Sequence, residues 1–268
     1  MAESAEMDDY LYFAIETMAR AGDISLRYFR TELEVENKAK KRKYDPVTRA
    51  DREVESYLRE RIRERFPGHA IVGEEYGNTQ GSSTLSWLID PIDGTRGFLC
   101  GTPMWGILLG LMDGERCVAG FVRQPFLDET YAGCDGKGFV LEGGGTRLPL
   151  RTRSTRTVED AIVCCTHPNM FRTGDERRTF AAVESACRFT RYGTDCYGYC
   201  LLARGFVDLV VEGDLEAYDI VPLIPIVEAA GGVVTDWKGN PAIRGGAVIA
   251  AANPALHEAA LRMIAAAG

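Results

Sequence analysis

The run Trp87-Leu88-Ile89-Asp90-Pro91-Ile92-Asp93-Gly94-Thr95 decides how the rest of the chain is interpreted. Its apolar start is typical of a buried strand, and the two carboxylates that follow predict a turn before a helix. Asp90 and Asp93 offer hard oxygen ligands on one side of this turn. Gly94 lets backbone amides approach an anion at the helix N-terminus. The run therefore predicts a place where a metal ion and a phosphate group bind together.

An Asp-x-x-Asp spacing alone is common on solvated loops, where it accompanies a capped helix start. Two further acidic segments favour the metal interpretation. An apolar strand at residues 70–72 runs into Gly73-Glu74-Glu75, and Glu216-Ala217-Tyr218-Asp219 opens an apolar stretch that ends Glu228-Ala229-Ala230-Gly231-Gly232. Crowded carboxylates repel one another, so three converging acidic segments predict a divalent cation. Oxygen ligands select magnesium, manganese or calcium, and the scattered cysteines form no zinc pattern.

In this order the segments resemble the motifs of the inositol monophosphatase family, which read Gly-Glu-Glu, then Asp-Pro-Ile-Asp-Gly-Thr, then an Asp opening a helix that ends Glu-Ala-Gly-Gly. Tyr218 stands where the family usually has Trp, and Ala230 adds one residue to the last motif. Neither change removes a metal-binding oxygen. The resemblance extends from about Tyr10 to the C-terminal helix.

The resemblance implies a mixed α+β and α/β fold, a layered α-β-α-β-α sandwich with two lobes and an active-site cleft between them. We expect residues 1–150 to form an N-terminal α+β lobe that carries the metal motifs. Residues 151–268 are expected to form a C-terminal α/β lobe that completes the site and reads the substrate.

Individual roles also follow from the resemblance. The implied ligands of two or three Mg²⁺ ions, for which Mn²⁺ can substitute, are the side chains of Glu74, Asp90, Asp93 and Asp219 and the carbonyl of Ile92. The implied substrate contacts are Asp93, Gly94, Thr95, Gly193, Thr194, Asp195, Glu212 and Asp219. The implied catalytic residues are Thr95, which orients a water molecule, and Glu74 or Asp51, either of which accepts its proton.

Asp45, Thr48 and Asp51 reproduce an Asp-x-x-Thr-x-x-Asp segment that reaches the metal site in the family, although plain N-capping is the alternative role for Thr48. Metal ions lower the pKa of bound water, so direct attack by water on the phosphate is the expected mechanism. A covalent phosphoenzyme is the rival, but it needs an aspartate that is free of metal.

The segments at residues 166–171 and 191–197 look most like the histidinol-phosphate phosphatase branch of the family. The expected reaction is hydrolysis of L-histidinol phosphate to L-histidinol and phosphate, a step of histidine biosynthesis. This substrate carries an ammonium group and an imidazole, which favour an acidic wall formed by Asp195, Glu212 and Asp214. The alternatives are the same chemistry on inositol monophosphate or a related small phosphate ester, helix capping as the role of Asp195, and a non-catalytic relative that only binds metal and phosphate.

A net charge of -8 and a pI near 5.1 argue against nucleic acid or an anionic membrane as a partner. A small phosphorylated substrate can still bind through metal. No apolar run is long enough to span a bilayer, and the eight cysteines suit reduced core positions, so we expect a cytoplasmic protein. A C2 homodimer is the default assembly.

The hydrophobic periodicity predicts helices from near Asp8 to near Arg30 and from Ala50 to Phe66, with a solvated basic run at residues 38–43 between them. Residues 105–151 read as an antiparallel meander. The chain then alternates between strands at 161–165 and 189–192 and helices at 176–187 and 196–204. A strand at 206–212, a helix from Asp219 that Pro225 disturbs, and strands at 233 and 247 follow. His69 and His257 are expected at the surface, and a structural role is expected for His167.

Overall fold

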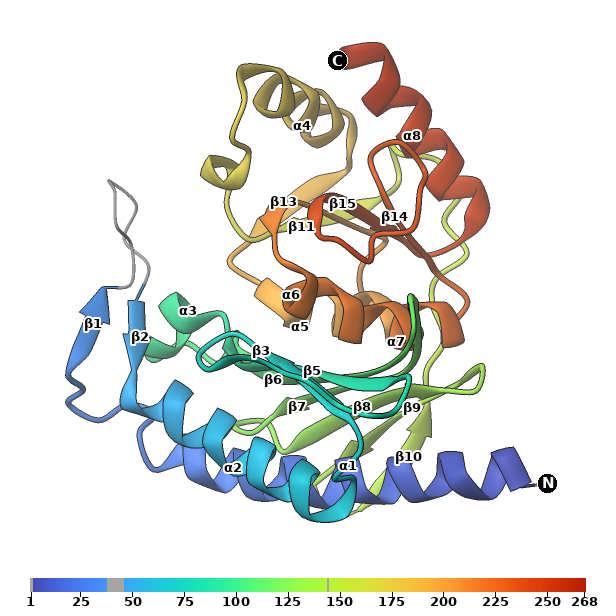
Figure 1. The fold of residues 1–268 in the computed structure, drawn as a ribbon. Helices are drawn as coiled ribbons and strands as arrows, with labels where there is room; N and C mark the ends of the chain where they lie inside the picture. The colour runs from blue at the N-terminus through green and yellow to red at the C-terminus, as the bar shows by residue number, and fades with distance from the viewer. Residues whose placement is uncertain (1, 38–45, 144) are drawn as a thin grey trace.

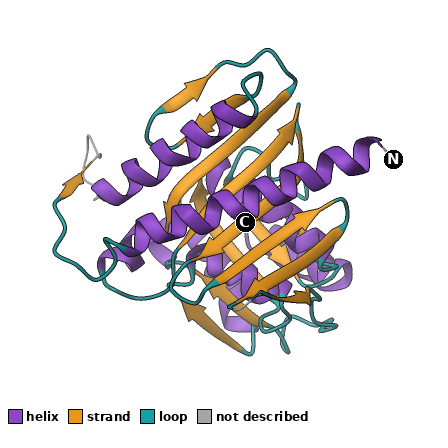
Figure 2. Cartoon of the chain, turned by 90° about the horizontal axis from the view of Figure 1, so that it is seen from below, coloured by secondary structure: helices purple, strands orange, loops and turns teal. Residues whose placement is uncertain are grey.

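Two β-sheets alternate with three sets of helices, which gives the α-β-α-β-α layers predicted from the sequence (Figure 1). The computed structural model describes residues 2–37, 46–143 and 145–268. Asp45 and the basic run at 38–43 lie outside these ranges. The first layer holds α1 (Ala2–Leu26) and α2 (Arg49–Arg65), and Figure 2 shows both helices covering one face of the first sheet.

The first sheet has eight strands in the order β10-β9-β8-β7-β6-β5-β3-β4. Only β3 and β5 run parallel to each other. The strands β6 to β10 form the antiparallel meander predicted for residues 105–151, and β6 also pairs antiparallel with β5. The strands are β3 (Ala70–Gly73), β4 (Gly77–Thr79), β5 (Leu85–Asp93), β6 (Gly106–Asp113), β7 (Arg116–Gln124), β8 (Glu129–Cys134), β9 (Lys137–Glu142) and β10 (Thr146–Pro149).

The second sheet has five strands in the order β12-β11-β13-β15-β14. It is mixed: β11 runs parallel to β12 and β13, whereas β15 runs antiparallel to β13 and β14. The strands are β11 (Ile162–Cys165), β12 (Phe189–Tyr192), β13 (Leu209–Leu215), β14 (Val233–Asp236) and β15 (Gly246–Ala251).

Short helices fill the layer between the sheets, and two longer helices cover the far face of the second sheet (Figure 1). The middle layer holds α5 (Asp195–Ala203), α6 (Ala217–Ile220), the 3-10 helix η2 (Val221–Leu223) and α7 (Ile224–Ala229), and the outer layer holds α4 (Gly174–Ala186) and α8 (Pro254–Ala267). The remaining elements are β1 (Val35–Asn37), β2 (Pro46–Thr48), α3 (Thr95–Leu99) and the 3-10 helix η1 (Pro168–Met170).

Apolar periodicity explains why the first layer packs as it does. Val54, Leu58 and Ile62 repeat at four-residue steps on α2 and are fully buried, and they share a core cluster with Trp87 of β5. Thr48 caps α2: its hydroxyl accepts a hydrogen bond from the Ala50 N–H (3.1 Å). The N-capping role that the sequence offered for Thr48 is therefore present.

Several sequence expectations were wrong in detail. α1 ends at Leu26 rather than near Arg30, which has a φ of 61°. The strand expected at 206–212 begins at Leu209 and continues to Leu215, because Phe206 lies outside the sheet and is 56% exposed.

Two histidines also differ from the sequence expectation, which placed both at the surface. His257 is buried and its Nε2 lies 2.8 Å from the Thr235 hydroxyl. His69 is half-buried and accepts a hydrogen bond from the Trp87 indole N–H at 3.1 Å. Short polar contacts to neighbouring layers hold both rings inside, and no local periodicity signals such contacts.

The two sheets occupy separate stretches of the chain, within residues 70–149 and 162–251. The division into lobes at residue 150 stays a prediction. Each of the eight cysteines is a free thiol. Within the described ranges, no helix combines the length and the apolar character that crossing a membrane requires.

Candidate metal and phosphate site

The end of β5 brings Asp90 and Asp93 to the same side of the sheet edge. In a regular strand, residues three apart point to opposite faces. Here the pairing with β6 shifts between Asp90 and Asp93, and Pro91, which has no N–H to donate, lies in the shifted part. The strand thus continues through Asp93, where the sequence predicted a turn, and the irregularity aims the two carboxylates together.

Asp219 comes to the same place from the middle helical layer. It lies in the first turn of α6, where its Oδ2 accepts a hydrogen bond from the Glu216 N–H (2.8 Å). One carboxylate oxygen from each of Asp90, Asp93 and Asp219 lies within 4.8 Å of the other two. Segments far apart in the sequence therefore meet, as the metal interpretation requires.

The charges of this cluster need a cation. Burial raises the pKa of Asp90 well above its ordinary value, and the neighbouring carboxylates of Glu74, Asp93 and Asp219 raise it further. The pKa of Asp219 is also raised well above its ordinary value by burial and by Asp93. Three converging carboxylates in a poorly solvated place match the oxygen-donor preference of Mg²⁺. The residues present therefore fit a divalent metal.

An open cleft of about 790 Å³ contains the cluster. It runs from the end of β5 to the segment that follows β11 and to the end of β13. The residues that line it are Glu74, Asp90, Ile92, Asp93, Gly94, Thr95, Arg96, Thr166, His167, Asn169, Met170, Arg172, Asp195, Asp214, Glu216, Tyr218 and Asp219.

Backbone geometry at the end of β5 suits the predicted phosphate position. Gly94 adopts a φ of 80°, which L side chains rarely adopt, and the chain enters α3 at Thr95. The Thr95 hydroxyl donates a hydrogen bond to the Ile92 carbonyl (3.0 Å). The Ile92 side chain is buried in a cluster with Phe98, so its carbonyl is the polar group that this residue can offer.

Asp195 forms part of the cleft wall beside the acidic cluster. It is the first residue of α5 and has a φ of 45°, whereas the N-cap position belongs to Thr194, so the helix-capping alternative does not describe Asp195. A Cβ built on Gly94 would lie 3.1 Å from the Asp195 Cβ. Burial and Asp93 raise the pKa of Asp195 to about 8, and Arg96 lowers it.

Three of the predicted substrate residues, Gly193, Thr194 and Glu212, are not among the residues that line the cleft. Glu212 lies inside β13 rather than at its end. Its Oε1 accepts hydrogen bonds from the Thr166 N–H (2.9 Å) and hydroxyl (2.7 Å). Glu212 therefore reaches the cleft through Thr166.

Asp51, one of the two predicted proton acceptors, also lies outside the cleft lining. Its Oδ2 accepts hydrogen bonds from the Thr48 N–H (2.8 Å) and hydroxyl (2.6 Å). Burial raises the pKa of Asp51 to about 6. Glu74, the other predicted acceptor, lines the cleft next to Asp90.

Two cleft residues, Arg96 and Arg172, belong to no segment that the sequence analysis singled out. Arg172, which follows η1, forms an ion pair with Asp214 of β13. Each missed residue adjoins a segment whose importance the sequence did indicate. The motif showed where the site lies, but which neighbouring side chains face inward depends on loop geometry.

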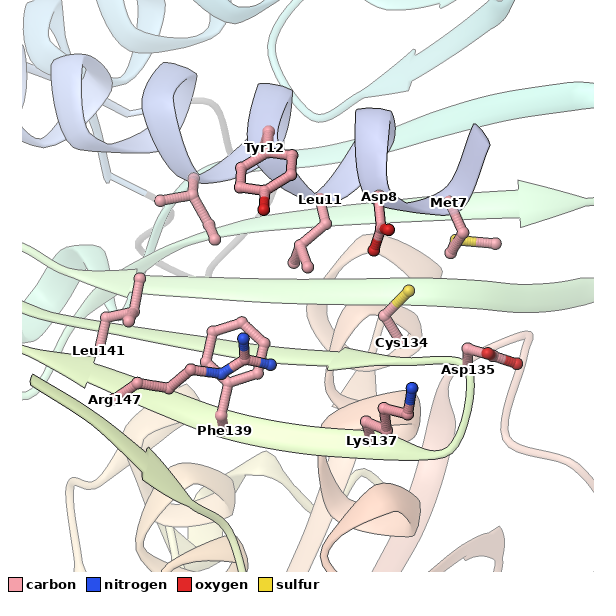
Figure 3. Close-up of a pocket in the computed structure, with 11 residues that line it drawn as sticks. Met7, Asp8, Leu11, Tyr12, Cys134, Asp135, Lys137, Phe139, Leu141 and Arg147 are labelled. Carbon is pink, nitrogen blue, oxygen red and sulfur yellow. The ribbon is translucent and has the colours of Figure 1, made fainter. Parts of the chain in front are cut away.

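A smaller hollow of about 390 Å³ lies between α1 and strands β8, β9 and β10 (Figure 3). Met7 and Leu11 of α1 line one side of it, and Phe139 and Leu141 of β9 line the other. The Arg147 guanidinium lies 3.6 Å from the centre of the Phe139 ring. This lining is mainly apolar, and its acids do not form a metal-binding group, so we place the catalytic site in the acidic cleft.

Comparison with known proteins agrees with this geometry. A model of the inositol monophosphatase family matches residues 6–267. The chain belongs to this family. Members of the inositol monophosphatase family are metal-dependent phosphatases, and the acidic cleft is the candidate site for this activity.

Its relatives differ in the substrates that their names state. The chain is 35% identical to the bifunctional phosphatase IMPL2, chloroplastic, of Arabidopsis thaliana, over 88% of this chain and 66% of that protein. It is 31% identical to a histidinol-phosphatase of Chlorobaculum parvum, over 92% and 93% of the two chains. A solved inositol monophosphatase from Zymomonas mobilis superposes with a TM-score of 0.84 and 35% identity, covering 96% of this chain and 98% of the other.

Proposed function

We propose that this family member hydrolyses L-histidinol phosphate to L-histidinol and phosphate, with two or three Mg²⁺ ions as cofactor. The observation that carries the proposal is the Asp195 carboxylate in the cleft wall beside the acidic cluster. Glu216 adds a further acid to the lining, whereas Asp214 is paired with Arg172. A cationic leaving group gains from such a wall, whereas an uncharged inositol ring does not. A bound cation would also lower the raised pKa of Asp195.

Asp90, Asp93 and Asp219 would hold the metal, with Glu74 and the Ile92 carbonyl beside them. Bound Mg²⁺ would neutralise the phosphate dianion and lower the pKa of a coordinated water. The Thr95 hydroxyl orients the attacking water, and the amides of Gly94 and Thr95 hold phosphate oxygens. Because Glu74 lines the cleft and Asp51 does not, Glu74 is the favoured proton acceptor.

The second candidate is hydrolysis of inositol monophosphate, which the likeness to the Zymomonas mobilis enzyme favours. Phosphate release from both substrates, measured after EDTA treatment and again after adding Mg²⁺, separates the candidates. We expect Mg²⁺ to restore activity and kcat/KM to be higher for histidinol phosphate. A clear preference for inositol phosphate would remove the histidinol proposal, and no release from either substrate would indicate a non-catalytic relative. Asp93→Asn should lose most activity while it stays folded.

Replacement of Asp195 by Asn tests the acidic wall directly. The change keeps the size of the side chain and removes one charge-assisted contact to the substrate cation, a contact worth about 1.5–3 kcal/mol. We expect kcat/KM for histidinol phosphate to fall about 10- to 100-fold, mainly through KM. The rate on inositol phosphate is the internal control and should change much less. Equal losses on both substrates would show that Asp195 does not read the leaving group.

A further inference from the structure

A polar stripe runs along the buried face of α2. Asp51, Glu55 and Arg59 follow one another at four-residue steps, so they lie on one side of the helix. They are 1%, 0% and 3% exposed. Charged residues are rarely this deeply buried unless they are paired. Asp51 is part of the capping box of α2, but the proposed function gives no role to Glu55 or Arg59.

Glu55 binds the backbone on both sides of its carboxylate. Oε2 accepts a hydrogen bond from the Glu75 N–H (2.7 Å), and Oε1 accepts one from the Tyr76 N–H (3.2 Å). Oε1 also accepts one from Arg59 Nε (2.6 Å). The two amides belong to the residues that follow Glu74, so the carboxylate fixes the turn that presents the Glu74 side chain to the cleft.

Arg59 holds the other end of the same turn. Its Nη1 donates to the Thr79 hydroxyl (3.1 Å), and its Nη2 donates to the Gly77 carbonyl. Gly73 shows how closely the pair fits the turn, because a Cβ built there would lie 2.1 Å from Glu55 Oε1 and 2.6 Å from Arg59 Nη2. The pair therefore fills the space beneath residues 73–77 and bonds to the turn, through the Glu75 and Tyr76 amides, and to β4.

Stability alone does not account for this arrangement. A buried ion pair is expensive to desolvate, and apolar residues of similar volume are often at least as stabilising. What apolar residues cannot do is hold two amides and one carbonyl of an irregular turn in fixed positions. Partners that orient a metal ligand commonly change metal affinity about 10- to 100-fold when they are replaced.

We propose that Glu55 and Arg59 are positioning residues for Glu74, and that they set the Mg²⁺ affinity of the cleft without touching metal or substrate. The inference rests on the proposed metal site. It adds that part of the metal affinity is determined inside the first helical layer.

The test replaces both partners at once, as Glu55→Met with Arg59→Met and as Glu55→Gln with Arg59→Gln. Both double variants keep the net charge, so a change in Mg²⁺ affinity cannot come from altered overall electrostatics. The second keeps a hydrogen-bonding group at each position, which protects the fold if the first is too disruptive. We expect the Kd of the metal-free protein for Mg²⁺, measured by calorimetry, to rise about 10- to 100-fold in the Met variant and less in the Gln variant. Amide exchange of Glu75 and Tyr76 should be faster without metal.

The matched control is a charge-neutral double variant of a distant pair, Asp208→Asn with Arg153→Gln. Asp208 is fully buried, accepts hydrogen bonds from Arg153 Nη1 (3.2 Å) and the Ile162 N–H (2.9 Å), and lies directly before β13 of the second sheet. The control should lower the free energy of unfolding and leave the Mg²⁺ Kd unchanged. A Kd within twofold of wild type in both test variants would overturn the positioning role. Failure of the unsubstituted protein to bind Mg²⁺ would instead overturn the metal site, and the positioning role with it.

Discussion

Asp90 is surrounded by other carboxylates, and its position is costly without metal. Its pKa is raised by burial and by Glu74, Asp93 and Asp219, so a negative charge on Asp90 destabilises the folded, metal-free protein. The carboxylates that allow metal binding are thus expected to lower the free energy of unfolding of the metal-free protein. The same residue can therefore stabilise the loaded protein and destabilise the empty one.

Replacing Asp90 by Asn should separate these two effects. In EDTA the free energy of unfolding should rise, because one repelled charge is removed. Added Mg²⁺ should stabilise wild type by about 2.7 kcal/mol at 100 times its Kd and should leave Asp90→Asn unchanged. Urea denaturation with and without Mg²⁺ measures both quantities. If the metal-free variant were less stable than metal-free wild type, repulsion between the carboxylates would not be what lowers the stability of the metal-free protein.

His257, in the outer helix α8, makes the stability of the protein depend on pH. Burial lowers its pKa below the ordinary value of 6.5. The unfolded chain therefore takes up the proton first as pH falls, so the contribution of His257 is complete above pH 6.5 and is lost below it. We expect His257→Gln to lose less stability than wild type between pH 7 and pH 5. Denaturation curves at both pH values check this, with His167→Gln at an exposed position as the control; equal losses in wild type and His257→Gln would contradict it.

At the residue scale, the sequence predicted the acids that meet but not all their surroundings. Asp90, Asp93 and Asp219 belong to short motifs in which chemistry restricts the residue types, so the motifs indicated them directly. Glu212 and Asp51 are acidic too, yet each binds a threonine: Glu212 binds Thr166 through a tertiary contact, and Asp51 binds Thr48 within the capping box of α2. The burial of His257 depends on Thr235, which lies in a different element.

At the scale of elements, η2 and α7 of the middle layer pack against a row of glycines in the first sheet. Gly110, Gly120, Gly133 and Gly138 are paired in register across β6, β7, β8 and β9. A Cβ on Gly120 would lie 1.9 Å from the Pro222 carbonyl oxygen. The row therefore lets η2 and α7 rest on the backbone of the sheet.

Gly120→Ala should lower the free energy of unfolding by about 1–3 kcal/mol, the usual cost of overpacking. The added methyl group must push η2 away from the sheet, since the atom it meets is backbone. Gly174→Ala is the control, because its Cβ would meet only the flexible Arg178 side chain, 3.3 Å away. Chemical denaturation of both variants checks the difference. A loss no larger than that of the control would mean that the helices adjust without cost.

Element boundaries in this region show what a sequence pattern can and cannot reveal. Pro225 predicted a disturbed helix, and the chain indeed passes from α6 through η2 to α7. The helix begins two residues before Asp219, because Glu216 is its cap. The glycine row could not be inferred from the sequence, because a single glycine is equally typical of a turn or of an irregularity in a strand.

At the scale of the whole molecule, the order of the layers was predicted through the family resemblance, whereas the contacts that join the layers were not. Glu129 of β8 accepts hydrogen bonds from the hydroxyls of Tyr131 (2.7 Å) and Tyr197 (2.8 Å) and from Arg204 Nη1 (3.0 Å). Tyr197 belongs to α5, and Arg204 directly follows it. The cytoplasmic location and the C2 homodimer stay predictions, because they concern the surroundings of the chain rather than its interior.

Replacing Glu129 by Gln should loosen α5 from the first sheet. The Glu129 and Arg204 side chains are 12% and 19% exposed, so a partner lost there is only partly replaced by water, and we expect a loss of about 1–3 kcal/mol in stability. Because the Cys196 N–H of α5 donates to Asp93 Oδ2 (2.6 Å), its amide exchange should also become faster. Glu142→Gln, which leaves Arg204 paired with Glu129, should change both quantities less. Unchanged exchange at Cys196 would show that α5 is held to the metal site by its own packing, independently of this contact between layers.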